Sequence, residues 1–79
     1  MRVRLLYFAS LRDAAGRDED LLETEAATLA QLYEQACELH GFVFARERLR
    51  VARNGAFANW DESANDCDEI AFIPPVSGG

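Results

Sequence analysis

The sequence predicts a two-layer α+β fold, in which one main helix packs on a mixed sheet of four or five strands. Residues 29–40 carry the apolar spacing of an amphipathic helix. Short segments rich in branched and aromatic residues occur on both sides of that helix, as strands require. With 79 residues, 49% hydrophobic and 28% charged, the chain has the composition of one small globular domain with a single core.

The first predicted strand covers residues 2–8 and has an unusual second face. Its odd-numbered residues are apolar, which makes one core-facing side. Arg2 and Arg4 begin the other side, but Leu6 and Phe8 continue it as apolar. A face in contact with water should not end in this way, so the second face of this strand is an anomaly.

A short helix and a second strand are predicted to follow. Ser10 is a suitable N-cap for a helix over residues 11–15, and Gly16 is a suitable residue to end it. Residues 18–25 are acidic and alternate in polarity, which favours a strand antiparallel to the first, with a charged outer face.

The main helix is predicted from residue 29 to His40 because both of its ends carry specific signals. Thr28 and Gln31 form a capping box, in which each side chain satisfies a free backbone amide. Gly41 is expected to end the helix, and Phe42 should pack back onto its last turn.

The C-terminal half predicts three further strands. Residues 49–53 and 56–60 flank Asn54-Gly55, which is the strongest short signal for a hairpin. Residues 69–73 form the last strand. Because the first and last strands are the most apolar, we expect them at the centre of the sheet, as in the ubiquitin-like β-grasp arrangement.

Charge and hydropathy exclude several classes of partner. Eight basic and fourteen acidic residues give a net charge of −6 and a pI near 4.6, which is the wrong sign for binding nucleic acid or an anionic membrane surface. The longest apolar run, Leu5 to Ala9, is far shorter than the roughly 20 residues of a bilayer span, and it is also too short for a signal peptide. We therefore expect a cytoplasmic protein that contacts neither nucleic acid nor membrane.

The residues predict no catalytic or metal centre. His40 is the only histidine and falls at a helix end, where a contact with the helix dipole is the simplest role. Cys37 and Cys67 are too far apart for a CxxC pair, so we expect a buried thiol and a loop thiol. The acidic stretch before the last strand does not form a calcium loop, because Asp66 and Phe72 replace the required glycine and glutamate.

The predicted domain covers residues 1–73, and the C-terminal tail covers residues 74–79. Because the domain offers no candidate for chemistry, the tail is the most informative segment for function. Pro74 and Pro75 make a stiff spacer, and Gly78-Gly79 ends the chain without side chains. Such an end can enter a channel too narrow for other residues, and it exposes the terminal carboxylate to activation.

The last ten residues, IAFIPPVSGG, resemble the C-terminal signature of the small subunit of molybdopterin synthase. The LYFA sequence of residues 6–9, Gly16 and the Asn54 hairpin extend this resemblance over most of the chain. The chain departs from the family pattern at Cys67, where the family has glycine, and at Arg53, where an apolar strand residue is usual.

The resemblance implies a sulfur carrier, which is a non-catalytic subunit of a sulfurtransferase complex and binds no cofactor. A separate adenylating enzyme would activate the Gly79 carboxylate with ATP, and a sulfur donor would convert it to a thiocarboxylate. The large synthase subunit would then take up Gly78 and Gly79, and sulfur would pass to a pterin precursor to form the dithiolene that binds molybdenum. In the family, two small and two large subunits form a heterotetramer.

The anomalous apolar face then becomes the expected docking surface for the large subunit. Ala71 and Ile73 lie on one side of the last predicted strand, next to the start of the tail. The alternative is that residues 42–48 fold over this face and cover it. The predicted partner-binding residues are Leu6, Phe8, Phe57, Ile73, Pro74, Pro75 and Val76.

Three other functions share parts of this pattern. A carrier of the same fold for thiamine thiazole or cysteine synthesis would differ in its partner. A ubiquitin-like protein modifier would join its terminus to lysines, although this chain has no lysine on which to build chains of itself. A plain binding module would carry the tail without using it.

Overall fold

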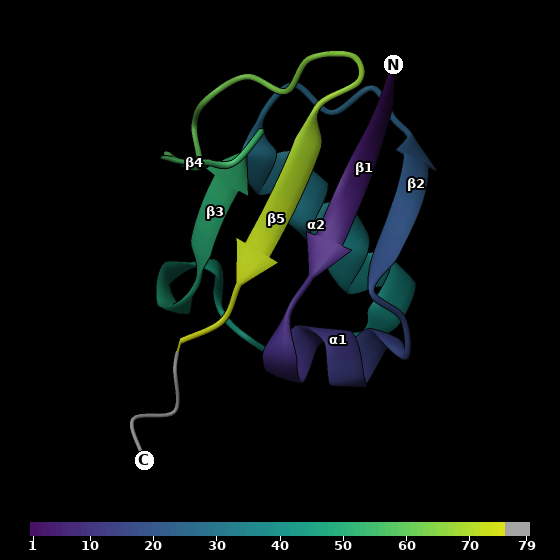
Figure 1. Ribbon diagram of the computed structural model, residues 1–79, viewed down its shortest axis with the longest axis vertical. Helices are drawn as coiled ribbons and strands as arrows, with labels where there is room; N and C mark the ends of the chain where they lie inside the picture. The colour runs from purple at the N-terminus through teal and green to yellow at the C-terminus, as the bar shows by residue number, and fades with distance from the viewer. Residues whose placement is uncertain (76–79) are drawn as a thin grey trace.

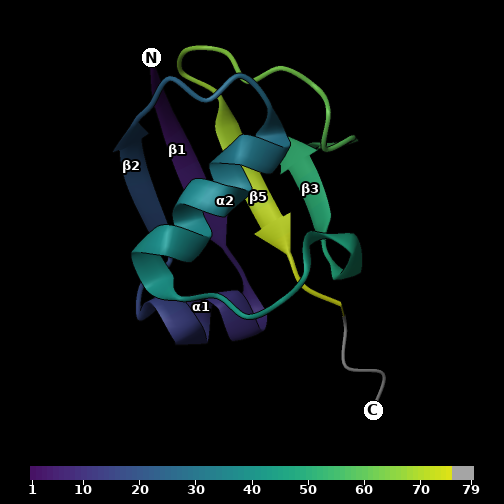
Figure 2. The same cartoon turned by 180° about the vertical axis from the view of Figure 1, so that it is seen from behind.

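The computed structural model describes residues 1–75, which form a sheet with helices at one face and one end (Figure 1). Seen from behind, α2 crosses one face of the sheet, and the opposite face is turned away from it (Figure 2). The elements in chain order are β1 (Arg2–Tyr7), α1 (Ala9–Ala15), β2 (Glu19–Glu23), α2 (Leu29–His40), the 3-10 turn η1 (Arg46–Arg48), β3 (Arg50–Arg53), β4 (Ala56–Ala58) and β5 (Glu69–Ile73).

The sheet has five strands in the order β2-β1-β5-β3-β4. β1 and β5 pair in parallel, and all other pairs are antiparallel. The prediction of a mixed sheet with the first and last strands near its centre is therefore confirmed. In the part of the chain that the structure describes, neither helix has the length and apolar content needed to cross a bilayer.

The main helix has the predicted ends. The Thr28 hydroxyl accepts a hydrogen bond from the Gln31 amide at 3.3 Å, and the Gln31 side chain returns to the Thr28 backbone. Gly41 adopts φ of 70°, in the left-handed region, and donates to the Cys37 carbonyl at 2.7 Å. The buried stripe that faces the sheet consists of Leu29, Leu32, Tyr33 and Ala36.

The predicted start of α1 is wrong by two residues. The helix begins at Ala9 and Phe8 is the N-cap residue, with no side-chain cap, so Ser10 lies inside the first turn. The reason is that β1 runs almost directly into α1. Phe8 keeps the extended backbone of the strand while its carbonyl accepts hydrogen bonds from Leu11 and Arg12, so the chain has already turned when it reaches Ser10.

The segment after α2 packs on the helix side of the sheet. Phe42 is buried, with its ring 5.4 Å from Tyr7 and 6.3 Å from Tyr33 between centroids. The Tyr33 hydroxyl donates to the Phe44 carbonyl at 2.7 Å, which fixes the next turn of the chain. The alternative that residues 42–48 cover the second face of the sheet is therefore wrong.

Both departures from the family pattern lie around the loop between β4 and β5. Arg53 forms an ion pair with Glu62 at 3.0 Å and donates to the Ser63 carbonyl at 2.9 Å, so it fastens this loop to the sheet. The buried Asp68 carboxylate accepts hydrogen bonds from the Asn54 side chain and the Asn65 amide. Cys67 lies in this loop directly before Asp68 and adopts φ of 68°, in the left-handed region.

We expect Cys67→Gly to stabilise the protein by about 0.5 to 1 kcal/mol. A residue with a Cβ is strained in the left-handed region by roughly 1–2 kcal/mol, and the greater freedom of glycine in the unfolded chain offsets part of the gain. Urea unfolding measures the difference. Cys67→Ala is the matched control, because it removes the thiol and keeps the Cβ. Equal stability of the alanine and glycine variants would contradict this explanation.

Candidate functional site

A row of apolar residues crosses the outer face of the sheet, which is the face turned away from α2. Leu6 pairs with Ala71, Ala71 pairs with Ala52, and Ala52 pairs with Phe57, so the row spans β1, β5, β3 and β4. Their neighbours along the strands, such as Leu5, face the core, which places the row on the opposite side. Phe57 is the most prominent member, with 64% of its surface exposed.

A second row lies beside the first, at the end of the sheet where β5 stops. Ile73 pairs with Arg50 and is half-buried. Phe8 follows β1 with extended backbone angles, so it continues the side of Leu6, and 44% of its surface is exposed. We call the six apolar residues of the two rows the outer apolar patch: Leu6, Phe8, Ala52, Phe57, Ala71 and Ile73.

The structure therefore brings the predicted residues Leu6, Phe8, Phe57 and Ile73 together on one surface. Ala52, which fills the gap between Phe57 and Ala71, was not among the predicted residues. Strand alternation could have found it, because Val51 is buried and its neighbour must face the other way. Ala52 and Ala71 are buried, Leu6 and Ile73 are half-buried, and the two phenylalanines are exposed. Exposed aromatic residues on an apolar face are typical of protein–protein contact sites.

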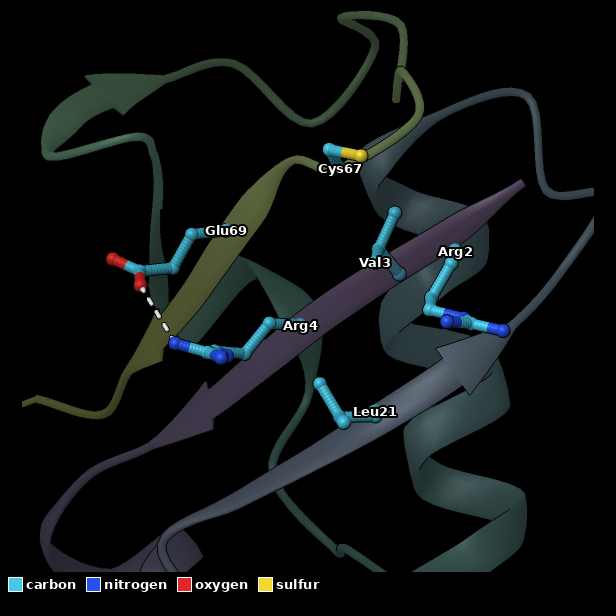
Figure 3. A pocket seen from close by; sticks show the side chains of 6 residues that line it. All are labelled: Arg2, Val3, Arg4, Leu21, Cys67 and Glu69. Carbon is cyan, nitrogen blue, oxygen red and sulfur yellow. Dashed lines mark ion pairs between the residues drawn. The ribbon is translucent and has the colours of Figure 1, made fainter.

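The rest of the outer face carries ion pairs, with Leu21 exposed among them. Arg4 forms ion pairs with Glu19 at 3.0 Å and with Glu69 at 3.8 Å, and Arg2 pairs with Glu23 at 3.1 Å. A depression of about 330 Å³ lies here, and Figure 3 shows Arg4 pointing toward Glu69 across it. The residues that line it are Arg2, Val3, Arg4, Leu21, Cys67 and Glu69. Because both of its arginines already have carboxylate partners, this depression offers no free cation to a ligand.

The tail begins at the edge of the outer apolar patch. The chain leaves the sheet at the end of β5, near η1 and α1 (Figures 1 and 2). Pro74 is buried and anchors this point to the domain, whereas Pro75 is exposed. The predicted site residues Val76, Gly78 and Gly79 lie outside the described residues.

A polar cluster that the sequence did not reveal joins β1, β2 and α2. The Asp20 carboxylate accepts a hydrogen bond from the Tyr7 hydroxyl at 2.7 Å and contacts His40 Nε2 at 2.6 Å, while Arg17 pairs with its other oxygen at 2.9 Å. Burial raises the pKa of Asp20, but the hydrogen bonds from His40 and Tyr7 outweigh it, so the pKa lies below its usual value. Burial and the bond to Asp20 raise the pKa of Tyr7.

The Asp20 cluster should make folding stability depend on pH. Because the pKa of Asp20 is lower in the folded state, its contribution is present above the unfolded value of about 3.9 and is lost as pH falls through the folded value. We expect Asp20→Asn to cost about 1–2 kcal/mol at neutral pH. Its free energy of unfolding should also fall less than that of the wild type between neutral and acid pH. Parallel pH profiles in urea melts would contradict this assignment.

The other candidates for chemistry in the described residues are potential metal ligands, His40 and the two cysteines. Over residues 1–75, no three His, Cys, Asp or Glu side chains come together to hold a metal ion. His40 Nε2 contacts the Asp20 carboxylate. Cys37 is half-buried, and burial raises the pKa of its thiol, which keeps it protonated; Cys67 is exposed and forms no disulfide.

Comparison with known proteins gives relatives that match the chain from end to end. The molybdopterin synthase sulfur carrier subunit of Escherichia coli (strain K12) is 31% identical over 80 residues, which cover 98% of this chain and 99% of the relative. The subunit of the same name from Chlamydomonas reinhardtii is 34% identical over 83 residues and covers all of both chains.

The fold is also that of a known structure. The crystal structure of SAMP1 from Haloferax volcanii superimposes with a TM-score of 0.83 at 26% identity and covers both chains completely. The family model described as ThiS family matches residues 5–79 of this chain. These matches confirm the resemblance that the tail and the first strand predicted, and the chain belongs to the ThiS family.

Proposed function

We propose that this protein is a sulfur carrier, which delivers sulfur as a C-terminal thiocarboxylate to the large subunit of molybdopterin synthase. The observation that carries the proposal is the position of the tail. It starts at the edge of an apolar patch whose two phenylalanines are exposed, on a domain whose described residues hold no metal-binding group. Relatives of the same length, named molybdopterin synthase sulfur carrier subunit, support the choice of pathway.

The proposed chemistry takes place at the main-chain carboxylate of Gly79. In the adenylating enzyme, a carboxylate oxygen attacks the α-phosphorus of ATP, and pyrophosphate leaves. A hydrosulfide-equivalent sulfur donor then attacks the acyl carbon, and AMP leaves, so that the terminus becomes a thiocarboxylate. ATP is a substrate of the adenylating enzyme, and the carrier itself binds no cofactor. We place these ATP-dependent steps in the cytoplasm.

The outer apolar patch is the proposed contact surface for the large subunit. Docking there would remove Phe57 from water and bring the adjoining tail root to the mouth of the active site. Pro75 stiffens the exit, so less conformational freedom is lost when the tail enters. The large subunit would supply the catalytic residues, and sulfur would pass from Gly79 to the pterin precursor within a heterotetramer of two small and two large subunits.

We expect Gly78→Val to retain association with the large subunit and to lose sulfur transfer. A channel that fits Gly-Gly has no room for a branched side chain, whereas the outer apolar patch supplies most of the contact. The test mixes the large subunit and the pterin precursor with carrier loaded as thiocarboxylate, and it follows molybdopterin formation. Gly78→Ala should fall between the wild type and the valine variant.

Two outcomes of this reconstitution would contradict the proposal. Normal turnover by Gly78→Val would exclude a narrow channel. If the loaded wild type served a thiazole-forming or cysteine-forming enzyme but not the large synthase subunit, the protein would be a carrier for a different pathway.

A further inference from the structure

The arginines of this protein fall into two groups. All eight basic residues are arginines. Five of them form ion pairs with carboxylates of the chain: Arg2, Arg4, Arg12, Arg17 and Arg53. Within residues 1–75, Arg46, Arg48 and Arg50 form none. These three residues, which we call the basic strip, are neighbours in the sequence.

The basic strip lies beside the tail root. Arg46 and Arg48 belong to η1, which both views place at the end of the sheet where the chain leaves β5 (Figures 1 and 2). Arg50 begins β3 and pairs with Ile73, the last residue of β5. Arg48 and Arg50 are exposed, while Arg46 is half-buried with its guanidinium 6.0 Å from the Trp60 ring centroid.

Arg50 also forms one rim of the outer apolar patch. Its guanidinium carbon lies 4.2 Å from the centroid of the Phe57 ring, within cation–π range. Stacking of this kind holds the charge in a defined position and leaves its hydrogen-bond donors free for a carboxylate. A fixed positive charge therefore adjoins both the exposed phenylalanine and the start of the tail.

The sign of this charge is opposite to that of the whole molecule. Residues 46–50 contain three arginines and one glutamate, Glu47, whereas the chain as a whole carries a net charge of −6. An acidic protein is repelled by carboxylates on a partner unless it presents a local positive surface to them. The basic strip is the region that can make such a contact, and it does so beside the proposed docking patch.

We propose that the basic strip binds carboxylates of the large synthase subunit at the mouth of the channel that receives the tail. This inference rests on the proposed function and adds the chemistry of the partner surface. Charges at the rim of an interface act mainly on the association rate and its salt dependence. The strip would therefore orient the incoming carrier, so that the tail faces the channel before the outer apolar patch contacts the large subunit.

The test is stopped-flow association of the carrier with the purified large subunit. At low salt, we expect the double variant Arg48→Gln with Arg50→Gln to associate about 10-fold more slowly than the wild type. The difference should disappear at about 0.5 M salt, where screening is strong. Arg2→Gln with Arg4→Gln is the matched control, because it removes the same charge from exposed ion pairs in the ionic half of the outer face and should associate at close to the wild-type rate.

Arg50→Lys separates the charge from the shape of the side chain. Lysine keeps the charge but lacks the flat stacking surface, so it should retain the wild-type association rate, whereas Arg50→Gln should not. If both variants associate as slowly as each other, Arg50 acts only by covering Phe57, and the inference is overturned.

The remaining outcomes separate this inference from the proposed function. If the double glutamine variant associates at the wild-type rate, or if the matched control is slowed equally, the role of the basic strip alone is overturned. Loss of adenylation with unchanged association would assign the strip to the adenylating enzyme and overturn it as stated. If the wild type and the large subunit do not associate at all, the proposed function itself is contradicted.

Discussion

Deletion of Gly79 should abolish sulfur loading and all molybdopterin formation, while the domain folds and melts as before. The reason is that, in the proposed function, the reacting group is the main-chain carboxylate of one residue. A carboxylate is a poor electrophile, so sulfur can be attached only after a better leaving group, such as AMP, is in place. Without Gly79 the new terminus is one residue shorter and stops short of both active sites.

Intact-mass spectrometry checks this prediction. Protein prepared with its adenylating enzyme, ATP and a sulfur source should contain a fraction in which one oxygen is exchanged for sulfur. Fragmentation should place the exchange on Gly79. Cys37→Ala and Cys67→Ala are the controls, and both should still acquire the sulfur because it is carried on the main chain. If the added sulfur instead mapped to Cys67 as a persulfide, the protein would be a cysteine-based carrier.

Phe57→Asp is expected to weaken association with the large subunit by more than about 100-fold. The change removes the most exposed aromatic ring of the patch, and exposed aromatic residues often carry much of the binding energy of an interface. A carboxylate at this position, even beside the Arg50 guanidinium, must also lose much of its water when an apolar surface docks on it. Because 64% of Phe57 is exposed in the free domain, its replacement should leave the free energy of unfolding within about 0.5 kcal/mol. Titration calorimetry measures the affinity, and circular dichroism with a thermal melt checks the fold.

The chain offers a close control for this variant. Leu21 is 66% exposed and lies in the ionic half of the outer face, among the residues that line the depression in Figure 3. Leu21→Asp makes the same kind of change at similar exposure, away from the tail root, and should bind like the wild type. Equal loss of affinity in both variants would show a general effect of charge. Unchanged affinity of Phe57→Asp would mean that the large subunit docks elsewhere.

Local signals in the sequence were sufficient for most of the elements. The Thr28 capping box and Gly41 set both ends of α2 as predicted, and the turn at Asn54-Gly55 has positive φ at both residues, as a type I′ hairpin requires. These signals act between residues a few positions apart, so they can be recognised without the fold. The start of α1 was missed because the path of β1 overrode the capping preference of Ser10.

The tail and the apolar second face of the first strand were also evident from the sequence alone, because a terminal Gly-Gly and a break in strand alternation need no partner to be recognised. Only the tertiary structure decided that this face stays uncovered by residues 42–48, that Ala52 completes the outer apolar patch, and that Arg50 stacks on Phe57. It also brought together Tyr7, Asp20 and His40, which are 13 and 20 positions apart along the chain. Such contacts depend on strand order and register, because these set which distant residues become neighbours.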